Sequence, residues 1–185
     1  MNGSLLLWLL LALAIFWGVG VHNRLMRIRA RGLDAFGSVE KHMRQFGELV
    51  RAHLAASEEA DPADGESTAD YLPEDWVRLL TSLEILEQAL KDARGTPLAV
   101  PALGQLATSF DNLQHAWEQL RSAPADLAGA TVPEALQSQW DAVTLRVQTA
   151  RGGMNQILVK YNEARVQFPA RLVVGVMGFQ IAGIL

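Results

Sequence analysis

The sequence contains no cysteine among its 185 residues, and this absence removes a large set of chemistries. A cysteine nucleophile, a disulfide framework and a thiolate metal site are all excluded. The absence also fits a reducing compartment. Histidine is scarce as well, with four residues: His22, His42, His53 and His115. No two are three or four positions apart, the spacing at which helical side chains meet, and no Glu-x-x-His occurs.

Sequence motifs for common reactions are missing too. Arg151-Gly152-Gly153 lacks the Gly-Lys-Ser/Thr ending of a phosphate-binding loop, and no Gly-x-Ser-x-Gly occurs. The net charge of −4, from 20 acidic and 16 basic residues, argues against a nucleic-acid binder. We therefore expect no catalytic residues, no metal, no cofactor, no nucleic acid and no small-molecule substrate, so the chain is not predicted to be an enzyme. An enzyme or metal protein would need a bound ion or a deep polar pocket.

An uncharged apolar run extends from Leu5 to Val21, and no Lys or Arg precedes it. As a helix the run spans ~26 Å, which is close to a membrane's hydrocarbon thickness. Four basic residues follow it, which predicts a retained single-pass anchor over residues 1–22 in the cell membrane, with the N-terminus outside and the rest cytoplasmic. Trp17 suits the interface, and the basic residues suit anionic headgroups: Arg24, Arg27, Arg29 and Arg31.

A cleaved signal peptide is the rival interpretation of the same run. Gly18-Val-Gly20 resembles a poor cleavage site. The start has no basic segment, however, and four arginines directly after cleavage would oppose export. The retained anchor is the preferred prediction.

The remaining apolar residues recur every three or four positions, as expected for helices. Four stripes follow one another: Leu25, Ile28, Gly32, Phe36, Val39, Met43, Phe46, Val50 and Leu54; then Trp76, Leu79, Leu83, Leu86 and Leu90; then Leu103, Leu106, Phe110, Leu113, Trp117 and Leu120; then Leu136, Trp140, Val143, Val147, Ala150, Met154, Leu158, Tyr161, Ala164 and Phe168. The first stripe continues the anchor without a proline. We find no alternating strand pattern, so the chain is expected to be all-α.

Short connections favour antiparallel neighbours, so we predict an up-and-down four-helix bundle over residues 23–171. An acidic linker is expected at about 57–72, where carboxylates cluster without Lys or Arg; an acidic docking site is the alternative. The fourth helix should return the uncharged tail, residues 172–185, to the membrane side. That tail is expected to pack in the membrane interface or on the bundle base, or equally to fold into the bundle core.

Several short motifs resemble the LemA family of bacterial membrane-anchored proteins. The last third carries Asn155, Tyr161-Asn162, Phe168-Pro169 and Gly178-Phe179 at the family's spacing, and His22-Asn23-Arg24-Leu25 looks like its Tyr-Asn-x-Leu. A Leu-Ile-Pro-Asn-Leu-type segment of the family is absent here, and the middle of the chain is weakly matched. The resemblance implies a single-pass protein of the bacterial inner membrane with a cytoplasmic helical bundle and no established reaction.

These observations predict a membrane-tethered interaction or scaffold module. Its partners would be the lipid bilayer and another membrane protein or a second copy of itself. A membrane-remodelling protein that acts by oligomerising at the bilayer is the alternative, which the resemblance also suggests. For Asn155 and Tyr161-Asn162, an interhelical hydrogen bond is preferred over a contact with a partner or lipid, and Asn23 is a suggested partner for that bond.

Overall fold

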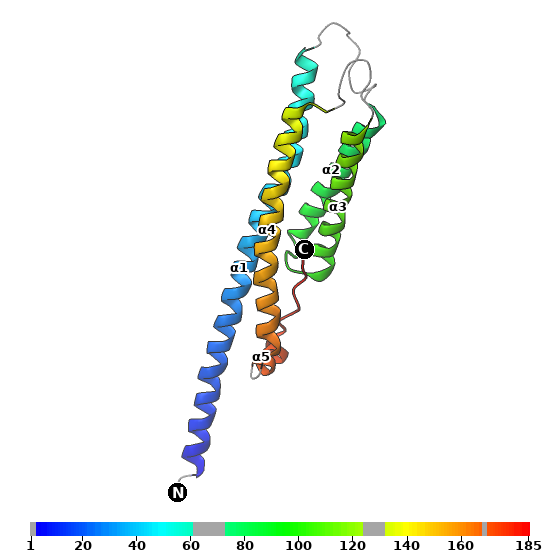
Figure 1. Ribbon diagram of the computed structural model, residues 1–185. Coiled ribbons are helices and arrows are strands. Elements are labelled where there is room, and N and C mark those ends of the chain that lie inside the picture. The colour runs from blue at the N-terminus through cyan, green and yellow to red at the C-terminus, as the bar shows by residue number, and fades with distance from the viewer. Residues whose placement is uncertain (1–2, 61–72, 124–131, 168–169) are drawn as a thin grey trace.

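One long helix, α1 (Gly3–Ala60), carries both the apolar run and the first stripe without a break. The computed structural model describes residues 3–60, 73–123, 132–167 and 170–185. Phe16 in the apolar run is 79% exposed, whereas Val39, Met43 and Val50 are completely buried. The two halves of α1 therefore have different surroundings, and Figure 1 shows the first half projecting beyond the other helices.

Three further long helices complete the bundle: α2 (Glu74–Ala93), α3 (Val100–Ser122) and α4 (Glu134–Val166). They alternate in direction, so the predicted all-α, up-and-down four-helix arrangement is confirmed (Figure 1). A short helix, α5 (Ala170–Met177), follows at the base of the bundle. The sequence stripes did not predict this helix. Part of the expected linker was wrong, because residues 57–60 belong to α1; residues 61–72 lie outside the described ones.

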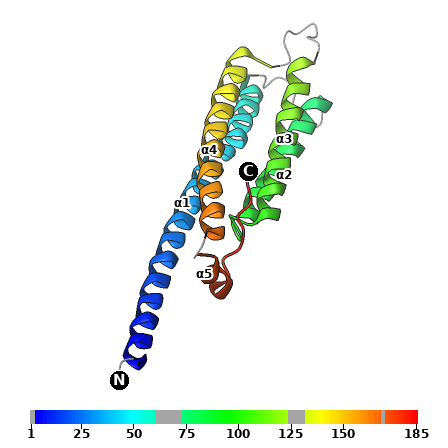
Figure 2. The ribbon, with the colours of Figure 1, turned by 60° about the horizontal axis from the view of Figure 1, so that its bottom comes forward.

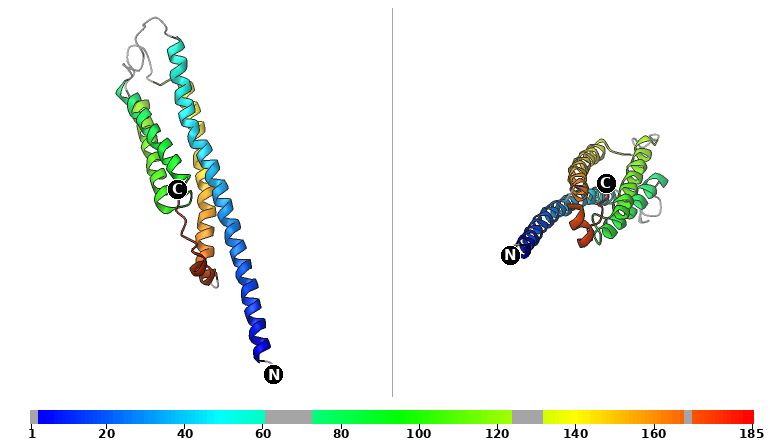
Figure 3. Two further views of the ribbon diagram at one scale, coloured as in Figure 1. Left: turned by 180° about the vertical axis from the view of Figure 1, so that it is seen from behind. Right: turned by 90° about the horizontal axis from the view of Figure 1, so that it is seen from below.

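The bundle is built from two helix pairs, α1 with α4 and α2 with α3, which Figure 3 shows from behind and from below. Large aromatic side chains fill the space between the pairs. The rings of Trp117 and Trp140 stack with centroids 4.1 Å apart, and Phe46 lies 4.4 Å from Trp140 and 6.0 Å from Phe110. These four side chains come from α1, α3 and α4, so they join the two pairs through one apolar cluster.

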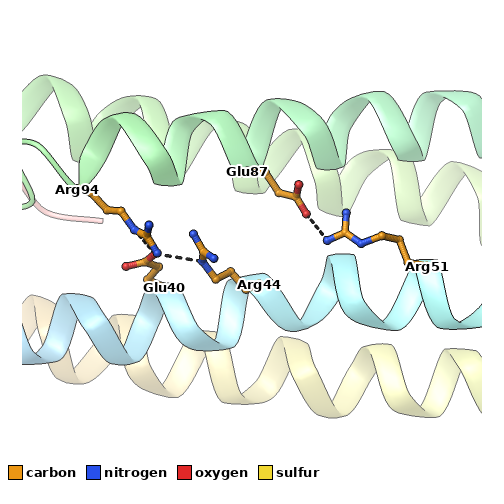
Figure 4. A network of polar contacts seen from close by, with 5 residues as sticks. All are labelled: Glu40, Arg44, Arg51, Glu87 and Arg94. Atoms are coloured by element: carbon orange, nitrogen blue, oxygen red, sulfur yellow. Dashed lines mark hydrogen bonds and ion pairs between the residues drawn. The ribbon is translucent and has the colours of Figure 1, made fainter.

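A polar seam connects α1 to α2 along the outside of the bundle (Figure 4). The half-buried Glu40 carboxylate pairs with Arg44 on its own helix and with Arg94 just after α2. Further along, Arg51 pairs with Glu87 at 2.6 Å, and this hydrogen bond raises the pKa of the Arg51 guanidinium. Because the three arginines and Glu87 are exposed to solvent, the seam contributes less to stability than the aromatic cluster does.

The histidines do not gather in the bundle. His53 stacks on Trp76 of α2 with ring centroids 5.5 Å apart, and its burial lowers the pKa of its imidazole. Among the described residues, no group of three or more His, Asp and Glu side chains is arranged to hold a metal ion.

In the described part of the chain, α1 is the one helix long and apolar enough to cross a membrane. None of that apolar window is buried against the rest of the protein. A signal sequence near the N-terminus would meet the same description, so the finding by itself establishes an apolar N-terminal helix.

Trp140 provides a test of the aromatic cluster. Replacing Trp140 by Ala should lower the free energy of unfolding by about 3–5 kcal/mol, because the lost ring leaves a cavity between the helix pairs. Urea unfolding of the detergent-solubilised protein, followed by circular dichroism, measures the change. Leu145→Ala on the same helix is the matched control, because Leu145 is 65% exposed and its loss should cost less than about 0.5 kcal/mol. Equal losses in the two variants would contradict the assignment.

Candidate functional site

The residues from 178 to 185, called the 178–185 segment below, lie against α4 as an extended chain. Gly178 ends α5 with a φ of +67°, a conformation that glycine adopts without strain. From there the chain turns back and runs antiparallel to α4, in the space between α4 and the start of α3 (Figure 2). The segment belongs to no helix or strand, so its buried backbone groups need hydrogen-bond partners outside regular secondary structure.

Two asparagines on α4 make most of the hydrogen bonds to the backbone of the segment. Asn162 donates Nδ2–H to the carbonyl oxygen of Ala182 at 2.9 Å and accepts the Ala182 N–H on Oδ1 at 3.0 Å. Asn155 makes the same pair of bonds with Leu185, at 2.6 Å and 2.9 Å. Each side-chain amide therefore hydrogen-bonds both the N–H and the carbonyl group of one residue, as a neighbouring strand would in a sheet.

The spacing of the two asparagines matches the spacing of the residues they bind. Seven positions along a helix advance by ~10.5 Å. Three positions along an extended chain advance by ~10 Å. Asn155 and Asn162 therefore lie on one face of α4 at the same spacing as Ala182 and Leu185, so each asparagine can form its pair of bonds.

Three more groups bind the same segment. Tyr161 donates its hydroxyl hydrogen to the Gln180 carbonyl at 3.2 Å, and Arg165 donates to the Phe179 carbonyl at 3.0 Å. On the opposite side, the Gly183 N–H donates to the carbonyl of Leu98 at 2.9 Å. We call this set the cradle: Asn155, Tyr161, Asn162, Arg165 and the Leu98 carbonyl. Burial raises the pKa of Tyr161 and the positive charges of Arg165 and Arg29 lower it, with a net rise, so the donor stays protonated at neutral pH.

The cradle admits only a narrow chain at its centre. Ala182 is 4% exposed and Leu185 is 6% exposed. A Cβ atom added to Gly183 would lie 2.9 Å from the Cα of Val100 and 3.3 Å from the Ala99 carbonyl oxygen. Backbone atoms cannot move aside as the end of a flexible side chain can, so a side chain at position 183 is incompatible with this docking.

The base of the site adjoins the end of the apolar run. The ring of Phe179 lies 5.6 Å from the ring of His22 on α1. A pocket of about 410 Å³ opens beside them, bordered also by Met26, Arg29 and Tyr161. The four predicted interface arginines are exposed on α1, and Trp17 is 37% exposed. The structure thus brings the arginines and the cradle to the same end of the bundle.

The structure corrects the expected partner of the asparagines. Asn23 is exposed on α1, and Asn155 and Asn162 bind the main chain of the 178–185 segment instead. Asn155, Tyr161, Asn162 and Phe179 do come together at one site. Phe168 and Pro169 lie outside the described residues.

Sequence reasoning missed Arg165, Gly183 and the Leu98 carbonyl. The seven-residue repeat of asparagine on α4, followed by a short segment with small residues, is the signal that could have pointed to the cradle. A helix pattern identifies neither the conformation of that segment nor the carbonyl that it meets.

Removing the Asn162 amide tests the cradle. In Asn162→Ala, the Ala182 N–H loses its acceptor, so its hydrogen exchange should accelerate by about tenfold or more and the free energy of unfolding should fall by about 2 kcal/mol. Amide exchange followed by mass spectrometry or NMR measures both effects. Asn112→Ala, on the exposed face of α3, is the control and should change neither quantity. Unchanged exchange at Ala182 in Asn162→Ala would contradict the described contact.

Comparison with protein-family models, with curated proteins and with solved structures finds no match for this chain.

Proposed function

We propose that this chain is a LemA-like single-pass membrane protein whose cytoplasmic bundle acts as a non-enzymatic interaction or scaffold module. The observation that carries the proposal is the division of α1 into an exposed apolar half and a buried half. In water, the exposed half would be a large unpartnered apolar surface, whereas a bilayer would cover it completely. A single rigid helix would then hold the bundle at a fixed distance from the membrane.

The distribution of charge supports an orientation in which the arginine end of the apolar run and the bundle lie on the same side of the membrane. Six ion pairs are present among the described residues, and none includes an arginine of the predicted interface. Those four arginines lie just past the apolar run, where anionic headgroups would provide the missing countercharge at about 1 kcal/mol each. The same bias supports a bundle on the cytoplasmic side of an inner membrane.

The residues behind the family resemblance support the proposal in a second way. Asn155 and the Tyr161-Asn162 pair belong to separate motifs, yet all three side chains bind one segment, to which Phe179 of a further motif belongs. The polar atoms of these side chains form hydrogen bonds with the chain's own backbone. A structural and binding role, with no reaction assigned, accounts for these contacts.

The outer face of α4 offers a surface for a partner. Leu145, Gly152, Val159 and Val166 recur at seven-residue intervals and are exposed, with Leu145 at 65% and Val166 at 69%. A seven-residue repeat of apolar and small residues is the pattern by which one helix packs along another. We propose that another membrane protein or a second copy contacts this face.

Membrane integration is the first test. The full chain should stay with the membrane pellet in alkaline carbonate, and its intact mass should include the apolar run. Replacing Leu9 and Leu13 by Arg should release it, since charges at the centre of a span cost ~2.5–3.5 kcal/mol each. Leu145→Arg, an equally exposed position on the bundle, is the control and should remain in the pellet. A shortened mass would show that the run is a cleaved signal sequence and would refute the anchor.

Crosslinking tests the scaffold role. A photo-crosslinking residue at Leu145 or Val159 should give discrete higher-mass adducts in living cells, because both positions lie on the proposed partner face. Thr108, exposed on α3, is the matched control and should give few adducts. Mass spectrometry would identify each adduct. Equal adduct patterns from α3 and α4 would contradict a specific partner face.

A further inference from the structure

The contacts of the 178–185 segment are those of a bound peptide. Its backbone makes hydrogen bonds to α4 side chains and to the α2–α3 connection. Such bonds depend on the path of the backbone more than on the identity of each side chain, and this is how grooves recognise extended peptides. Docking of the segment is therefore a binding reaction that happens within one chain.

The cradle is nevertheless selective. It requires a residue without a Cβ at position 183, because of the contacts with Val100 and Ala99, and it buries small and apolar side chains at positions 182 and 185. Ile181 and Ile184, by contrast, are 58% and 54% exposed and place no demand on the groove. The best match for this pattern is the 178–185 segment itself, which every copy of the chain carries.

The position of the cradle favours an encounter between copies. Resting on the proposed membrane anchor, every copy presents its cradle on the same side of the bilayer and at the same height. Confinement to a plane raises the effective concentration of one copy's segment near another copy's cradle. The connection from Gln167 to Gly178 reaches ~36 Å when extended, at about 3.3 Å per residue. That distance exceeds the ~20 Å width of two adjacent helices.

We propose that the cradle is a peptide-binding site that also takes the 178–185 segment of a second copy, so that neighbouring chains exchange segments. The exchanged pair keeps every hydrogen bond between cradle and segment, because each cradle still holds an identical segment. The cost of exchange is therefore limited to the loss of translational freedom and the opening of α5, which is why exchange of identical elements is a low-cost route to dimers. The arrangement is reciprocal, with a twofold axis along the membrane normal.

Two complementary variants test the exchange. Asn155→Ala/Asn162→Ala disables the cradle and leaves the segment intact. Gly183→Val disables the segment and leaves the cradle intact. Alone, neither variant can form the interaction, and each should leave the Ala182 amide in fast exchange. Mixed in one membrane, the intact segment of the first variant can enter the intact cradle of the second.

The readout is hydrogen exchange in an isotopically labelled copy of the Asn155→Ala/Asn162→Ala variant. With Gly183→Val as its unlabelled companion, we expect exchange at its Ala182 and Leu185 amides to slow by about tenfold or more. We also expect the two differently tagged chains to copurify in detergent. Mixing with a second, unlabelled copy of the cradle variant is the matched control and should leave exchange fast.

Two results would overturn the proposal. Fast exchange in the mixture, with both variants retaining wild-type helical content, would show that the segment docks only within its own chain. Copurification without slowed exchange would show that the chains pair through another surface. If Gly183→Val does not fold, Gly183→Ala serves in its place, since a Cβ already meets the Val100 backbone. Carbonate extraction of the same variants reports on the anchor separately, so failure of the exchange is distinguishable from failure of the proposed function.

Discussion

The structure depends on one constraint, which is that α1 is a single continuous helix with two different surroundings. Its first part has no protein against it, while side chains such as Val39 and Phe46 are completely buried by the other helices. Because α1 has no break, there is no flexible joint between its exposed apolar half and its buried half. The direction of the apolar run therefore fixes the direction of the bundle. The positions of the other helices follow, because α4 packs along α1 and carries the cradle.

The cradle adds a second level of organisation at the end of the bundle nearest the apolar run. The 178–185 segment lies between α4 and the α2–α3 connection, and it binds both. It therefore links the two helix pairs at the base, while the aromatic cluster of Phe46, Phe110, Trp117 and Trp140 links them further along. A change in the docking of the segment would therefore act on both helix pairs at once.

Much of the fold could be predicted because its cause is local. Residues such as Leu79, Leu83 and Leu86 recur at the helical period, and burying them on one side requires a bundle. The ends of the elements were less predictable: the end of α1 extended past the expected linker boundary, and α5 was not anticipated. The candidate site was predicted only in part. Asn155 and Asn162 attracted attention because asparagine is a modest helix former, but their expected partner, Asn23, was wrong.

By itself, the sequence determined the four amphipathic helices and the uncharged run with arginines after it, since both depend on residue spacing along the chain. It also determined the seven-residue repeat of the two asparagines. The tertiary structure alone decided what those asparagines bind. Ala182 lies 20 positions after Asn162, and Leu185 lies 30 positions after Asn155. The extended segment has no periodic sequence pattern from which its position in the fold could be predicted. The match between seven helical residues and three extended ones becomes visible only when the two elements lie side by side.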